Sequence, residues 1–102
     1  MPAKTKRELA EELLIEAKKR EIQGLTTYGD FIPSEDTRIL SYEAIEEVLD
    51  AWVYIGFYRR KYPESAPRTD GIRALLLSTY ISLRRLEEEE RTHNKGGDLS
   101  DQ

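Results

Sequence analysis

The sequence predicts an all-α protein, a three-helix chain forming a helical bundle that dimerisation completes. Apolar residues recur at helical spacing in three stretches, and glycine and proline gather between these stretches. Of the 102 residues, 35% are charged and 38% hydrophobic, as in a soluble, helix-rich protein with a modest core. We expect one helical domain over residues 1–92, with helices at about 4–22, 39–62 and 70–91, a loop at 23–38 and a flexible tail at 93–102.

The composition limits the classes of function. The chain contains no cysteine, so it has no disulfide framework and no thiolate nucleophile or metal ligand. Its net charge of −4 disfavours a nucleic-acid backbone as partner. No apolar run approaches the roughly 20 residues that span a bilayer, and the N-terminus lacks the apolar region of a signal peptide. We therefore expect a cytoplasmic protein that binds neither nucleic acid nor a membrane.

The first predicted helix has a recognisable start and one apolar face. Thr5 and Glu8 have the spacing of a capping box. Leucine and alanine at positions 9, 10, 13, 14 and 17 share one side of the helix. Glu12 and Glu16 lie one turn apart at the border of that side. They either reach inward towards a site or pair with neighbouring cations in solvent.

The predicted loop is long for a small domain, and long loops often carry function. It holds two glycines and an Ile-Pro step that disfavours helix before Pro33. Tyr28 either packs this loop onto the core or lines a base-sized pocket. Ser34 with Thr37, or Asp36 alone, is expected to cap the helix that follows.

The central helix carries two different faces. An apolar stripe contains Ile45, Val48, Leu49, Trp52 and Gly56. Another side gathers the carboxylates of Glu43, Glu46, Glu47 and Asp50, followed one turn later by Tyr54. Such a face is either a solvated surface or a site for a hard divalent cation, because Mg²⁺ prefers oxygen ligands.

The third predicted helix, capped by Thr69 or Asp70, has more apolar surface than one partner can cover. We expect a core stripe at Ile72, Leu75, Leu76, Thr79, Leu83 and Leu86, and Leu77 and Ile81 form a second strip. The excess predicts a homo-oligomer, a dimer or larger, in which two chains complete the bundle. Arg73, Tyr80 and Arg84 lie near one line and either face an anionic ligand or remain solvated.

The run Glu46-Glu47-Val48-Leu49-Asp50, which leads into an apolar helix with Tyr54, resembles a known pattern. The all-α nucleoside triphosphate pyrophosphohydrolases of the MazG type carry a Glu-Glu-x-x-Asp segment in this setting. The preceding chain, from Tyr28-Gly29-Asp30 to Glu43-Ala44, is similar to small MazG-like proteins of phages and bacteria. The resemblance covers about residues 24–60.

The resemblance implies a bundle that binds Mg²⁺, with Mn²⁺ as an alternative, through carboxylates of two helices. Its reaction would convert a nucleoside triphosphate to the monophosphate and pyrophosphate. Glu47 and Asp50 match the second acidic motif, with Glu43 beside them. The first motif, Glu-Glu-x-x-Glu, is not matched, because Ile15 stands where its last acid belongs and Glu16 comes one place later. Three alternatives remain. Glu12 and Glu16 replace the first motif, or Glu43 and Glu46 on the central helix supply both halves of the metal site, or catalysis has been lost.

The resemblance also implies roles for further residues. Glu46 or Glu12 would act as general base, Arg73 or Arg84 would hold the phosphates, and Tyr28 or Tyr54 would stack on the base. The competing hypothesis is a non-catalytic helical dimer that serves as a protein-interaction module.

Overall fold

The computed structural model describes residues 2–29 and 38–100, and within them the side chains other than those of 26–28 and 95–100. Three α-helices contain most of these residues: α1 (Lys6–Tyr28), α2 (Leu40–Lys61) and α3 (Ala66–Ser100). A short 3₁₀ helix, η2 (Pro63–Ser65), joins α2 to α3. No strand occurs in the described ranges, so the all-α prediction is confirmed there. The chain divides into two units, residues 1–37 and 38–102.

The first unit consists of α1, which begins as predicted and ends later. The Thr5 hydroxyl accepts a hydrogen bond from the Glu8 backbone N–H at 3.1 Å, and the Glu8 carboxylate accepts one from the Thr5 N–H at 3.2 Å, which confirms the capping box. The helix continues past the predicted end near residue 22 to Tyr28, through Gly24. It stops at Gly29, whose φ of 83° suits a residue without a side chain.

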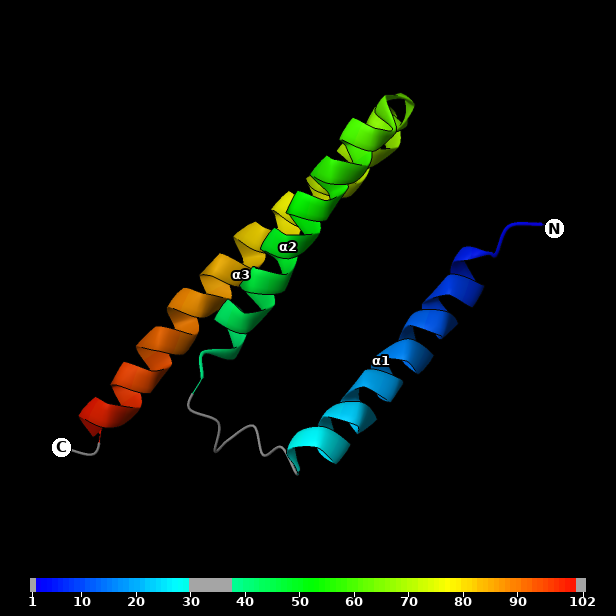
Figure 1. The fold of residues 1–102 in the computed structure, drawn as a ribbon. Coiled ribbons are helices and arrows are strands. Elements are labelled where there is room, and N and C mark those ends of the chain that lie inside the picture. The colour runs from blue at the N-terminus through cyan, green and yellow to red at the C-terminus, as the bar shows by residue number, and fades with distance from the viewer. Residues whose placement is uncertain (1, 30–37, 101–102) are drawn as a thin grey trace. The chain divides into compact units, whose positions relative to one another are not determined.

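The second unit is an antiparallel hairpin of α2 and α3, which lie side by side in Figure 1. In α3 the buried and half-buried side chains alternate at spacings of three and four, as in a coiled-coil seam. These seam residues are Ala66, Thr69, Arg73, Leu76, Tyr80, Leu83, Glu87 and Glu90. In α2 the facing residues include Ser41, Ile45, Val48, Ile55 and Arg59. Ile45, exposed by only 1%, is the fully buried apolar side chain of the described residues.

The third helix differs from its prediction in both its bounds and its buried face. It begins at Ala66 and not near residue 70, and it continues to Ser100 through much of the predicted tail. Thr69 is therefore no cap: its buried hydroxyl donates to the carbonyls of Ser65 and Ala66, both at 3.1 Å. Leu76 and Leu83 do face α2, but Leu75 is 70% exposed and Leu86 51% exposed. Leucines lie on three sides of this helix, so periodicity alone selected the wrong stripe.

The start of α2 is capped from α3. The predicted caps Ser34, Asp36 and Thr37 lie outside the described residues, and Ile39 at the cap position makes no side-chain hydrogen bond. The Glu90 carboxylate accepts hydrogen bonds from the backbone N–H groups of Leu40 (3.0 Å) and Ser41 (2.9 Å), and from the Ser41 hydroxyl. A carboxylate at a helix N-terminus also meets the positive end of the helix dipole. Glu90 thereby links α3 to the start of α2 at the open end of the hairpin.

A single buried carboxylate stands one turn earlier in the α3 seam. Glu87 is 5% exposed and accepts hydrogen bonds from Arg84 at 2.7 Å and from Arg91 at 2.8 and 3.2 Å. Two guanidinium groups compensate its loss of hydration, which is the condition for burying a carboxylate. Together with Glu90, it makes the open end of the hairpin polar.

Glu90 makes the stability of the hairpin dependent on pH. The hydrogen bond from the Ser41 hydroxyl, followed by those from the Ser41 and Leu40 N–H groups, lowers the pKa of the Glu90 carboxyl. A lowered folded-state pKa stabilises the fold above the ordinary glutamate value of about 4.3, and this contribution is lost as the pH falls through the folded-state pKa. We expect Glu90→Gln to lower the melting temperature at pH 7, with the difference from wild type shrinking on acidification. Melting by circular dichroism measures this; Glu89→Gln, an exposed neighbour, is the control, and a pH-independent difference would contradict the assignment.

Candidate functional site

The predicted acidic face exists on the side of α2 turned away from α3. Glu43, Glu46, Glu47 and Asp50 are all exposed. Within residues 38–94, whose side chains are described, none of the four forms a hydrogen bond or an ion pair. Like charges at i, i+4 destabilise a helix by roughly 0.2–0.5 kcal/mol per pair. The face therefore carries negative charge that no described cation offsets.

The acids of α1 are arranged differently. Glu12 pairs with Lys4 at 2.5 Å, and Glu16 pairs with Lys19 at 3.1 Å. Both pairs are exposed, and such pairs contribute about 0.2–1 kcal/mol or less. Glu12 and Glu16 belong to the first unit and the α2 acids to the second. The prediction that both sets supply one metal site stays a prediction.

The donor chemistry of the α2 face suits Mg²⁺, although its side chains do not form a closed cage. Among the described residues, no group of three or more aspartate, glutamate or histidine side chains is arranged to enclose a metal ion. Mg²⁺ is usually held by one or two carboxylates together with water and substrate phosphates. Glu47 with Asp50, three residues apart, or Glu43 with Glu47, four apart, can supply that number from one face.

An aromatic pair follows the acids along the same exposed side. Tyr54, 71% exposed, meets Phe57 edge to face, with ring centroids 6.4 Å apart and an interplanar angle of 83°. The Arg60 guanidinium carbon lies 5.6 Å from the centre of the Phe57 ring. The sequence pattern indicated Tyr54 but not Phe57. The position of Phe57, three residues after Tyr54, was the available signal, because residues three apart are neighbours on a helix.

The two predicted phosphate-binding arginines have different surroundings. Arg84 is paired with Glu87 at 2.7 Å, so its charge is already compensated. Arg73 lies in the seam with its guanidinium carbon 4.6 Å from the centre of the Trp52 ring, a cation–π contact. Its Nε is buried without a hydrogen-bond partner in the described structure. Tyr28, predicted to stack on a base, has no described side chain.

Gly56 provides the space that Arg73 occupies. A Cβ atom at residue 56 would lie 2.5 Å from the Arg73 Nη2 atom, closer than real contacts allow. The space left by the missing side chain is therefore filled by a guanidinium group.

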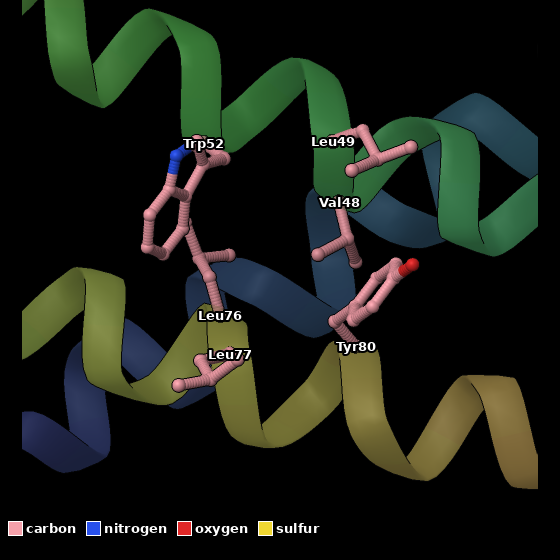
Figure 2. A pocket seen from close by; sticks show the side chains of 6 residues that line it. All are labelled: Val48, Leu49, Trp52, Leu76, Leu77 and Tyr80. Carbon is pink, nitrogen blue, oxygen red and sulfur yellow. The ribbon is translucent and has the colours of Figure 1, made fainter.

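An apolar groove lies between the two helices beside this contact (Figure 2). Its volume is about 190 Å³, below the roughly 300–1,000 Å³ of typical small-molecule pockets. Val48, Leu49 and Trp52 line it from α2, and Leu76, Leu77 and Tyr80 line it from α3. It is too small and too apolar to receive a nucleoside triphosphate by itself.

Comparison with protein-family models, with curated proteins and with solved structures found no match to this chain. Among the described residues, no helix is long and apolar enough to cross a membrane.

The contact between Arg73 and residue 56 can be tested by a double-mutant cycle. Gly56→Ala gains about 1 kcal/mol of helix propensity, but it must displace the guanidinium from Trp52. We expect it to be neutral or destabilising in the wild type and stabilising in an Arg73→Ala background, where the space is free. Urea unfolding of the four proteins measures this. Equal effects of Gly56→Ala in both backgrounds would show that the guanidinium does not occupy the space.

Proposed function

We propose that the chain is a Mg²⁺-dependent nucleoside triphosphate pyrophosphohydrolase whose metal is held by a pair of carboxylates on α2, Glu47 with Asp50 or Glu43 with Glu47. The observation that carries the proposal is the set of unpartnered, exposed carboxylates on one face of α2. The resemblance of the Glu47-Val48-Leu49-Asp50 run to the MazG-type acidic motif supports the same residues. The α1 acids, each paired with a lysine, are secondary candidates.

The residues along this side of α2 match the parts of a nucleotide. Bound Mg²⁺ supplies neutralisation of the triphosphate charge and activation of the attacking water. Glu47 and Asp50 offer it carboxylate oxygens. Tyr54 provides an exposed aromatic ring against which a base can pack. Lys61, which has no ion pair in the described structure and lies on the same side of the helix as these acids, carries positive charge for phosphate.

A second candidate is the non-catalytic interaction module. It is favoured by the amount of apolar surface that the hairpin leaves exposed, including Leu49, Val53, Phe57, Leu75 and Leu77. Groups of exposed apolar side chains on this scale mark interaction surfaces. Catalysis and assembly do not exclude one another.

Pyrophosphate release from deoxy- and ribonucleoside triphosphates, with Mg²⁺, Mn²⁺ or EDTA, tests the enzyme directly. We expect release that requires a divalent cation and stops in EDTA. Folded protein that is silent with every nucleotide would contradict the proposal and favour the interaction module.

Substitution separates the two sets of acids. We expect Asp50→Asn to lower kcat/KM by about 100-fold or more, because it removes a metal ligand. Glu16→Gln, which breaks an exposed ion pair on α1, should have a small effect. Steady-state kinetics with circular dichroism as a folding control measures both. An active Asp50→Asn enzyme would contradict the assignment, and a large loss in Glu16→Gln would show that α1 supplies the second half of the site.

Metal binding should also reverse the effect of Asp50 on stability. Without Mg²⁺, Asp50→Asn relieves repulsion from Glu46 and Glu47, so we expect a slightly higher melting temperature than wild type. With Mg²⁺ the wild type gains stability by mass action and the variant gains less. Thermal melting with Mg²⁺, compared with melting in NaCl of equal ionic strength, measures this difference. Equal gains in the two proteins would exclude binding at Asp50.

A further inference from the structure

A second exposed stripe of α2 has a symmetric spacing: the intervals between its residues are the same when counted from either end. Its two end residues carry opposite charges. It consists of Glu46, Leu49, Val53, Phe57 and Arg60, separated by three, four, four and three residues. At about 100° per residue these five positions fall within a sector of about 80° on the helix. All five are exposed: Leu49 and Val53 by 49% each, and Phe57 by 53%.

We propose that this stripe is a two-fold interface with a second copy of the chain, in which the two α2 helices run antiparallel about an axis at Val53. The symmetric spacing places Val53 against Val53 of the partner subunit and Leu49 against Phe57 of the partner subunit. Glu46 then meets Arg60 of the partner subunit, and the reverse pair forms by symmetry. The proposal rests on charge and spacing and does not depend on nucleotide hydrolysis.

The charges favour a second copy of the chain as the partner and an antiparallel orientation of the two α2 helices. Neither Glu46 nor Arg60 has an ion pair in the described structure. A parallel pairing would place Glu46 against Glu46 and Arg60 against Arg60, which like-charge repulsion disfavours. Antiparallel pairing joins each acid to a base and covers the three apolar residues between them. The stripe is thus complementary to itself.

The stripe also explains why α2 is apolar on two sides. Ile45, Val48 and Ile55 face α3, while Val53 and Phe57 face away from that seam. Leu49 lies between the two sides, because it is 49% exposed and also lines the groove beside α3. A helix that is apolar on most of its circumference is usually enclosed by partners. Pairing through α2 would place both α2 helices in the interior and both α3 helices outside.

Charge reversal tests the interface. We expect the wild type to be a dimer by light scattering and sedimentation, and Glu46→Arg or Arg60→Glu alone to raise the dimer dissociation constant by about tenfold or more, because each variant opposes like charges twice. Mixing the two variants should restore dimers, as should the double variant Glu46→Arg/Arg60→Glu in one chain. Glu89→Arg and Arg85→Glu, exposed positions on α3, are matched controls that should remain dimeric.

A cysteine cross-link tests the position of the axis. The chain has no cysteine, so Val53→Cys introduces a single thiol, which we expect to oxidise readily to a disulfide-linked dimer. Ser82→Cys, exposed on α3, should cross-link poorly in comparison. A wild type that stays monomeric at high concentration would overturn the proposal, because another part of the chain would then cover the stripe. A dimer that neither responds to charge reversal nor cross-links at residue 53 would overturn it as well.

Discussion

The structure depends on one constraint, which is that a two-helix seam can cover only one side of each helix. The seam of α2 and α3 buries Ile45 fully and Leu76, Tyr80 and Leu83 in part. It leaves most of the apolar surface of both helices exposed. Burial of apolar area is the main stabilising contribution to folding. The described hairpin gains only part of the stabilisation that its apolar residues could provide, because many of them remain exposed. A contact with another part of the chain or with a second chain would bury these exposed apolar faces.

The ends of the seam are polar, and each charged residue there is compensated in a different way. Glu90 accepts backbone N–H groups from the start of α2. Glu87 is enclosed by two arginines of its own helix, and Arg73 lies against the face of Trp52. The contacts of Glu90 and Arg73 exist only in one register of the hairpin, because a shift by one turn would separate them from Ser41 and Trp52. Such polar groups fix the register of α2 against α3 more than they add to the net stability of the fold.

The sequence predicts where the helices lie better than it predicts which residues of different helices contact one another. Periodicity located all three helices, and it placed the four α2 acids on one exposed face, because that pattern is local to the helix. It failed for α3, where leucine occurs on three sides of the helix and the choice of the buried stripe depends on which residues of α2 pack against it. The cap of α2 could not be predicted locally, since Glu90 stands 50 residues after Leu40. The extension of α1 to Tyr28 was missed because Gly24 suggested a break that the helix tolerates.

The acidic face and the two-fold stripe lie on neighbouring sides of α2, and this geometry connects the two proposals. Glu43, Glu47 and Asp50 fall outside the stripe, so pairing of two α2 helices leaves them open to solvent. In the antiparallel arrangement, Lys61 of the partner subunit reaches the level of Ile45, one turn or less from Glu43 and Glu47, because positions across the axis add up to twice residue 53. Lys61 lies on the same side of its helix as these acids. Carboxylates for a metal and a cation for phosphate would then come from different chains, so a single copy would hold only part of the site.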